Sequence, residues 1–158
     1  MKRRRGTLFL ILAALLLLLT ACGGAPNVDW ELTISGDVDN PTTFTYRELA
    51  KMELVSLDEI LMEKSTGEDE IRSWSGVELS ELLDEASAGE FSTITALAAD
   101  GYAIEVTEDE LESAIVALKD HEDWIANTTP DKGPIRLVTP ETPANRWVFQ
   151  LTEIQVNR

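Results

Sequence analysis

The sequence predicts a single α+β domain of mixed topology that is rich in β-strands and has short helices. Strand-like and helix-like segments alternate without the regular spacing of repeated βαβ units. Asp100-Gly101 lies between two strand-like runs and is a strong hairpin signal. The chain after residue 28, about 130 residues, suits one domain with its own core. These three observations together favour a mixed, β-rich fold.

The first half of the domain is expected to contain strands and one capped helix. Residues 30–36 alternate as a strand does, and residues 37–41 have turn chemistry. Thr45 and Glu48 form a capping box that opens a short helix through Met52. Residues 53–64 fit either one bent strand or two pieces, and residues 65–70 are a polar loop. Residues 75–78 are expected to form a second capping box, followed by a helical apolar stripe at positions 77, 79, 82, 83 and 86.

The second half is expected to be mostly strands. Residues 93–99 and 102–107 flank Asp100-Gly101, where a type I′ turn needs positive φ at both central positions. Thr107 and Glu110 cap one more short helix. The remaining strands are expected at residues 115–118, 124–126, 135–139 and 146–156, with the polar turn KDHED between the first two.

The N-terminus has the layout of a lipoprotein signal peptide at residues 1–21. Positions 2–5 are basic, residues 7–19 are largely apolar, and small residues precede Cys22. The stretch LTAC resembles the bacterial lipobox, which implies cleavage before Cys22 and lipid attachment to its thiol. An uncleaved N-terminal anchor is the alternative. Residues 22–28 are then a lipidated tether, residues 29–157 the domain, and the protein is expected on the extracytoplasmic side of a bacterial envelope membrane.

The mature chain is expected to be strongly acidic, and its charge is uneven. Four of the 13 basic residues precede Cys22, which leaves nine against 29 acidic residues and a formal charge of −20. Such a surface repels nucleic acid and anionic lipid headgroups. Residues 126–158 carry four basic and three acidic residues, so an anionic ligand is expected to bind there. Solubility is the simpler explanation of the acidity elsewhere.

Most catalytic constellations are absent from the sequence. Cys22 is the only cysteine and His121 the only histidine, so neither a thiolate site in the domain nor a two-histidine metal site is available. No nucleophile elbow, Walker loop or dinucleotide-binding glycine motif is present. We expect no catalytic residue and no metal site. Trp74 and Trp147 are expected in the core rather than stacked on a ligand.

Arg136 raises the main question about function, because it lies between Ile135 and Leu137 in a strand-like stretch. A charge among apolar neighbours needs a partner. A guanidinium grips a phosphate or a carboxylate bidentately, and carboxylates abound in this chain. An internal ion pair, with Asp131 or a nearby glutamate, is therefore favoured over a ligand contact.

Four segments in register resemble the molybdopterin-binding domain of the sulfite oxidase family of oxidoreductases. They are WSGVELSELL (74–83), AADGYAIEVTEDEL (98–111), GPIRLVTP (133–140) and RWVFQLTEIQV (146–156). The resemblance covers residues 29–157 and implies a β-rich α+β fold of that type. It also implies cofactor contacts at Arg136, Arg146 and Lys132, since basic residues near these positions grip the cofactor's phosphate.

The sequence departs from the family's pattern at three positions. The stretch around residues 60–72, where the family has a molybdenum-ligating cysteine, has none. Asp131 replaces a histidine and Phe149 a lysine. The leading hypothesis is therefore a membrane-tethered binding or interaction module without redox activity, whose partner is an envelope protein or a small anionic ligand. The alternatives are an oxidoreductase domain that still binds molybdopterin through Arg136 and Arg146, and a purely structural lipoprotein.

Overall fold

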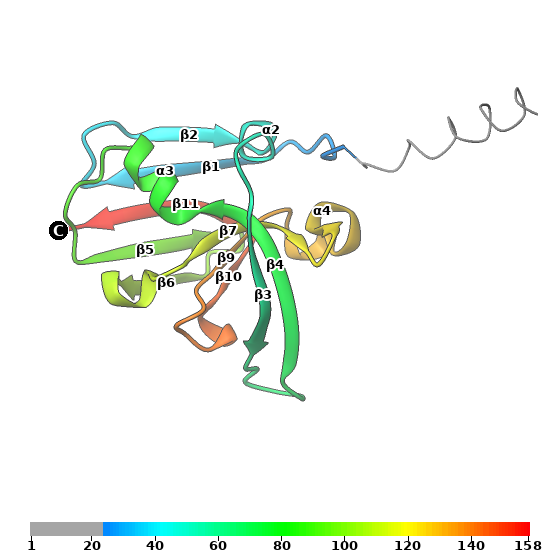
Figure 1. Cartoon of the computed structure of the whole chain (residues 1–158). Helices are drawn as coiled ribbons and strands as arrows, with labels where there is room; N and C mark the ends of the chain where they lie inside the picture. The colour runs from blue at the N-terminus through cyan, green and yellow to red at the C-terminus, as the bar shows by residue number, and fades with distance from the viewer. Residues whose placement is uncertain (1–23) are drawn as a thin grey trace, which may run out of the picture.

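The computed structural model describes residues 24–158, which form two β-sheets with short helical segments around them (Figure 1). The predicted signal peptide and Cys22 lie outside the described residues. The strands are β1 (Glu31–Gly36), β2 (Thr42–Thr45), β3 (Val55–Met62), β4 (Glu70–Glu78), β5 (Thr93–Ala98), β6 (Ala103–Thr107), β7 (Ile115–Asp120), β8 (Asp123–Trp124), β9 (Arg136–Val138), β10 (Val148–Phe149) and β11 (Leu151–Asn157). The helical segments are α2 (Tyr46–Leu49), α3 (Leu79–Glu85), η2 (Glu108–Leu111), α4 (Ile125–Thr128), η3 (Pro130–Lys132) and η4 (Ala144–Arg146).

The first sheet has the strand order β2-β1-β11-β5-β6 and joins the two ends of the domain. β1 pairs with β11 in parallel, whereas the other neighbours are antiparallel. The β5–β6 hairpin confirms the prediction at Asp100-Gly101, but its turn is not type I′. Only Gly101 has positive φ (89°), and Asp100 Oδ1 instead accepts the N–H of Tyr102 (2.9 Å). The loop between β5 and β6 consists of residues 99–102 and is therefore longer than a two-residue turn.

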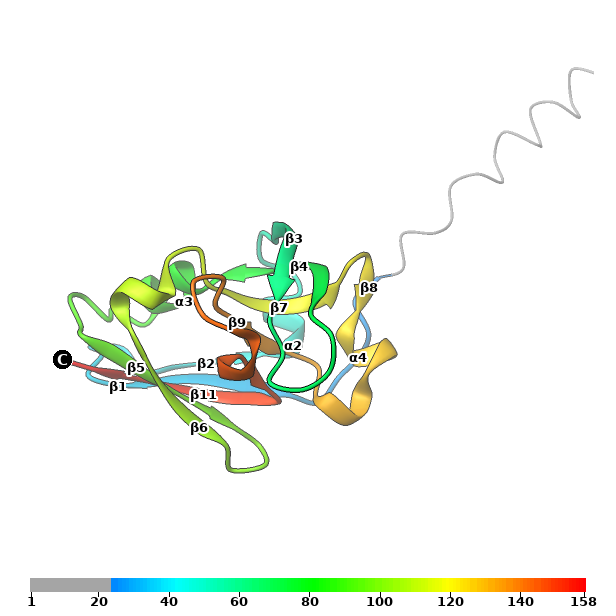
Figure 2. The ribbon, with the colours of Figure 1, turned by 90° about the horizontal axis from the view of Figure 1, so that it is seen from below.

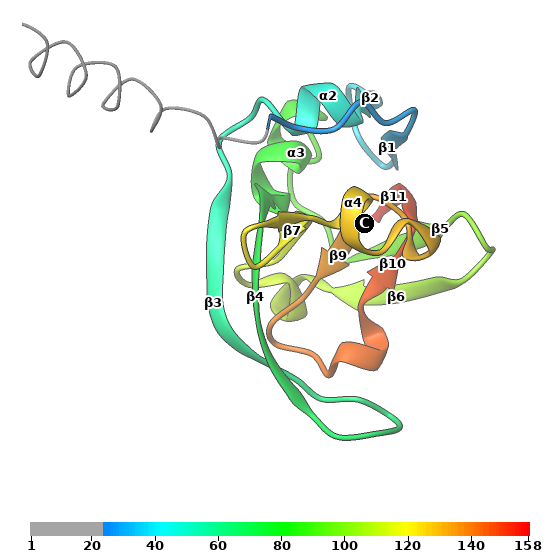
Figure 3. The same cartoon turned by 90° about the vertical axis from the view of Figure 1, so that its right-hand side faces the viewer.

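The second sheet has the strand order β10-β9-β7-β4-β3, with β8 paired to β7. Of the two alternatives for residues 53–64, the structure has one strand, β3, over residues 55–62. Its register against β4 shifts between Leu57 and Ile60, with Glu59 at φ 54°. β3 and β4 form a long curved hairpin that extends beyond the rest of the sheet (Figure 3). The sheet is antiparallel throughout.

Residues 75–78 do not form the predicted capping box, because they are the last residues of β4. A Cβ on Gly76 would lie 2.1 Å from the carbonyl oxygen of Val116, so the glycine permits the close approach of β7. α3 begins at Leu79 without a side-chain cap. Strand pairing thus overrides the local helix signal. The capping boxes at Thr45 and Thr107 are both present.

Residues 146–156 are not one strand either. Arg146 lies in η4, β10 belongs to the second sheet and β11 to the first. Gln150, at φ 51°, lies between the two strands. The chain switches from the second sheet to the first at Gln150, a change that the strand-like sequence of this stretch does not reveal. Ala126, predicted at the end of a strand, lies instead in α4.

Two hydrophobic clusters form the core. The main core includes inward-facing residues of both sheets and the buried residues of α2 and α3, such as Ile154, Val116 and Leu82. The small core consists of seven buried residues: Trp74, Ile115, Ala117, Ile125, Val138, Ala144 and Trp147. Within residues 24–158, no helix is both long and apolar enough to span a bilayer.

Candidate functional site

Arg136 lies at the start of β9 and is only 4% exposed. β10 places Phe149 directly opposite it, and Ala117 of β7 is its partner on the other side. The guanidinium carbon lies 3.8 Å from the centre of the Phe149 ring and 4.5 Å from that of Trp74. Both distances are within the range of cation–π attraction. The arginine is therefore held by aromatic rings.

The predicted internal ion pair of Arg136 is wrong. No carboxylate in residues 24–158 forms a salt bridge with it, and its buried Nε–H has no hydrogen-bond partner there. Burial lowers the pKa of Arg136 to about 10, because desolvation disfavours the charged form. Asp120 opposes this shift and Arg72 adds to it. Asp131 contributes only its backbone carbonyl to a nearby contact, accepting from Gln150 Nε2 (3.2 Å).

Phe149 also lies near the second predicted basic residue, Lys132. The Lys132 Nζ is 5.8 Å from the ring centre, so two cations lie around one ring. Lys132 is at the end of η3, and Gly133 follows at φ 74°. A Cβ on Gly133 would lie 2.7 Å from the Cα of Gln150. The glycine of the GPIR motif thus lets η3 pack closely against the residue that follows β10.

Arg146, the third predicted basic residue, is occupied by a different set of partners. Both of its Nη atoms donate to the Glu110 carboxylate, with Nη2 to Oε2 at 3.1 Å, and Nη2 also donates to the Glu105 carbonyl (3.0 Å). The Arg146 bonds, followed by the Thr107 backbone N–H, lower the pKa of Glu110 to about 2. Arg146 is therefore paired with a carboxylate and is not grouped with Arg136.

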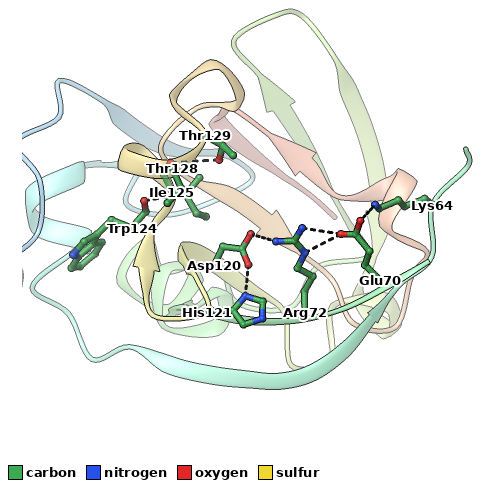
Figure 4. Close-up of polar contacts among 9 residues, drawn as sticks. All are labelled: Lys64, Glu70, Arg72, Asp120, His121, Trp124, Ile125, Thr128 and Thr129. Carbon is green, nitrogen blue, oxygen red and sulfur yellow. Dashed lines mark hydrogen bonds and ion pairs between the residues drawn. The ribbon is translucent and has the colours of Figure 1, made fainter. Parts of the chain in front are cut away.

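The sequence interpretation missed a charged network that is centred on Arg72 (Figure 4). Two of its members, Asp120 and Arg72, act electrostatically on Arg136. Arg72 donates to Glu70 (Nη2 to Oε2, 2.8 Å) and to Asp120 (Nη1 to Oδ2, 2.9 Å). Lys64 also donates to Glu70, and the bonds from Lys64 and then Arg72 lower the pKa of Glu70 to about 2. His121 Nδ1 lies 2.8 Å from Asp120 Oδ1. The sequence feature that could have revealed this network is Arg72, a basic residue two positions before Trp74.

Trp74 and Trp147 are both buried, as predicted, and meet edge to face with their rings 5.9 Å apart. Trp147 Nε1 donates to the carbonyls of Thr139 (2.9 Å) and Thr142 (3.2 Å). Trp74 Nε1 is buried without a partner among residues 24–158. The small core thus contains one unpaired N–H, on a ring that packs against the Arg136 guanidinium, whose Nε–H is also unpaired within residues 24–158.

A hollow of about 240 Å³ opens beside Phe149 and Trp147. Its other lining residues are Ala98, Asp100, Tyr102, Ala144 and Asn145. None of the three predicted basic residues lines it, and its one charged residue is a carboxylate. The hollow therefore does not present positive charge to a phosphate.

The side chains present do not fit a molybdenum cofactor held in the family's manner. Residues 24–158 contain no cysteine and no cluster of side chains able to hold a metal ion. The Phe149 ring lies against the Arg136 guanidinium, and Glu110 binds Arg146. No mechanistic step through a cofactor follows from this arrangement.

Comparisons with known proteins agree with the fold. A family profile described as the oxidoreductase molybdopterin binding domain matches residues 22–158. A search of curated proteins gave no match. The crystal structure of the sulfane dehydrogenase SoxCD from Paracoccus pantotrophus is similar, with a TM-score of 0.73 at 19% sequence identity over 85% of this chain. The match covers only 40% of that longer chain. The protein belongs to the oxidoreductase molybdopterin-binding domain family.

Proposed function

We propose that this protein is a lipid-anchored, extracytoplasmic binding module that has kept the family's fold without its redox activity. The observation that carries the proposal is the surroundings of Arg136. The residue at the family's phosphate-binding position is buried against Phe149 and Trp74. An aromatic ring provides no hydrogen-bond donor for a phosphate, so a family lysine replaced by Phe149 weakens any anion site.

Two further observations support loss of the cofactor. The only cysteine of the chain is Cys22, which the lipobox resemblance assigns to lipid attachment. Arg146 is bound on both Nη atoms by Glu110, so its release for a phosphate would break a bidentate contact. These features remove or occupy the groups that the family resemblance assigns to cofactor binding.

The anchoring part of the proposal comes from the N-terminal sequence. The basic, apolar and small-residue segments before Cys22 match a lipoprotein signal peptide, and two or more acyl chains give stable anchoring. The described chain begins without regular structure and reaches β1 at Glu31. Replacing Cys22 by Ser should abolish labelling of the protein by a radioactive fatty acid in the producing bacterium. Persistent labelling would contradict lipid attachment at Cys22.

The test of cofactor loss is a measurement of bound metal and bound pterin from one preparation. Residues 23–158 are expressed in a cytoplasm that makes the molybdenum cofactor, and their folding is checked by circular dichroism. We expect neither molybdenum nor oxidised-pterin fluorescence in stoichiometric amounts. Near-stoichiometric values of both would overturn the proposal.

A second candidate function is molybdopterin binding without the thiolate ligand, with an oxidoreductase activity built on it. One observation favours it: the buried Arg136 has an unpaired Nε–H and no carboxylate partner in residues 24–158. In that case the preparation contains pterin, and Arg136→Ala releases it. Pterin retained at the wild-type level in Arg136→Ala would rule out this site.

A further inference from the structure

A second surface, separate from the residues around Arg136, has the features of a docking site. A groove of about 250 Å³ is lined by residues of α3, of η2 and of the segment that leads into β5. Figure 2 shows the ribbon of α3 and β5 from below. Its lining residues are Leu79, Ser80, Leu83, Asp84, Ala88, Gly89, Phe91, Glu108, Leu111 and Glu112. None of them belongs to the charged network or to the hollow beside Phe149.

The floor of the groove is apolar. Leu79, Leu83 and Ala88 are buried in the main core, whereas Phe91 and Leu111 pack against that core and remain partly exposed. A groove of this volume is large enough for one or two aliphatic or aromatic side chains. Burial of such a side chain is favourable in proportion to the apolar area removed from water.

The rim of the groove is acidic and largely uncompensated. Asp84, Glu108 and Glu112 line it, and none of them forms a salt bridge within residues 24–158. The adjoining surface of α3 adds further carboxylates at Glu78, Glu81 and Glu85. Arg158 lies beside Ala88 and Gly89 of the groove, and its Nη2 donates to the Ala88 carbonyl (3.5 Å). Unpaired charges of one sign around an apolar floor favour a partner of the opposite sign.

We propose that this groove docks a basic segment of a partner protein, with an apolar side chain on the floor and lysine or arginine residues against the rim. The charge of the chain argues against a second copy as the occupant, because two acidic rims repel each other. A bound metal ion is disfavoured, because residues 24–158 contain no cluster of ligands for one. The inference rests on the proposed role as a binding module and names the chemistry of its partner.

The test uses the full-length protein in a non-ionic detergent and two labelled heptapeptides, KKLFLKK and KKSNSKK, read by fluorescence anisotropy. The peptides carry the same charge, and only the first has apolar side chains. We expect KKLFLKK to bind at least about tenfold more tightly, and its affinity to fall as salt rises from 50 to 500 mM. Micelles without protein are the blank.

Matched variants locate the binding. Glu108→Gln with Glu112→Gln should weaken KKLFLKK binding about tenfold, whereas Asp58→Asn with Glu59→Gln removes two carboxylates on β3 and should leave it unchanged. Leu111→Ala should weaken binding several-fold, and Leu61→Ala, which truncates an exposed leucine, should not.

Equal affinity for the two peptides, equal losses in the two carboxylate pairs, or no binding of KKLFLKK would each overturn the docking site. None of these results bears on cofactor loss, which depends on the metal and pterin contents. Stoichiometric molybdenum would overturn the proposed function and leave the peptide result unaffected.

Discussion

The two cores of the molecule both consist of buried side chains but differ in the polar groups found in and beside them. In and beside the main core, Trp30 Nε1 donates to the Leu151 carbonyl (2.7 Å), whereas the buried Tyr46 hydroxyl has no partner within residues 24–158. In and beside the small core, Trp74 Nε1 and Arg136 Nε both lack partners within residues 24–158. A buried unpaired donor costs about 1–3 kcal/mol.

The difference in unpaired buried donors corresponds to a difference in the surroundings of the two cores. The main core joins the two sheets and needs only apolar packing. The small core lies beside Arg136, where the family resemblance implies a phosphate contact, and Trp74 Nε1 and Arg136 Nε both lack a partner within residues 24–158. Aromatic contacts to Arg136 offset part of that cost. Aromatic rings thus occupy the surroundings of Arg136, as the proposed loss of cofactor binding requires.

The largest expected effect tests whether the two cores are equally well packed. Ile154→Ala in the main core and Ile115→Ala in the small core each remove a fully buried aliphatic side chain. Each should lower the free energy of unfolding by about 2–5 kcal/mol in urea denaturation. A loss below about 0.5 kcal/mol for Ile115→Ala would mean that the small core is not packed as described.

The tryptophan pair gives the next largest effect. Trp147→Phe removes the indole N–H that the Thr142 carbonyl accepts and one of three donors to the Thr139 carbonyl, which keeps the N–H and hydroxyl of Thr142. Trp74→Phe removes an N–H that has no partner within residues 24–158. Trp147→Phe should therefore cost about 1–3 kcal/mol more than Trp74→Phe. Thermal unfolding of the two matched variants measures the difference. Equal losses would reveal a partner for Trp74.

Replacement of the buried Arg136 should change the free energy of unfolding only slightly, and the change should be stabilising if there is one. Met keeps much of the buried volume and removes a cation that burial disfavours. The free energy of unfolding of Arg136→Met should be unchanged or higher by about 1 kcal/mol, because a desolvated charge without a salt-bridge partner in residues 24–158 is lost. A loss of about 3 kcal/mol or more is the size expected when a buried ion pair is broken, and it would contradict the aromatic setting.

The smallest effect is the pH dependence of the exposed ion pairs. The folded-state pKa of Glu110 is lowered from 4.5 to about 2, mainly by Arg146, so its contribution is present above about pH 4.5 and is lost as the pH falls toward 2. The difference in Tm between the wild type and Glu110→Gln should shrink over that interval. A difference that stays constant from pH 5 to pH 2 would show that the pair does not contribute.

Local signals predicted much of the fold, and long-range contacts account for the errors. The β5–β6 hairpin and the caps at Thr45 and Thr107 depend on neighbours in sequence, and all are present. The box at residues 75–78 failed because β7 pairs with that stretch. The burial of Arg136 was readable from its apolar neighbours, but its contacts come from β4 and β10, which no local pattern brings together.

The central claim, that aromatic rings close the site at Arg136, is tested most directly by the NMR signal of the Arg136 Nε–H, assigned by its loss in Arg136→Lys. We expect a resonance shifted upfield by the two rings, slow in exchange with water, and unmoved by millimolar pyrophosphate. Phe149→Ala should reduce the upfield shift. A saturable change of this signal on titration of the wild type with pyrophosphate would contradict the claim, because it would mean that an anion still reaches the guanidinium.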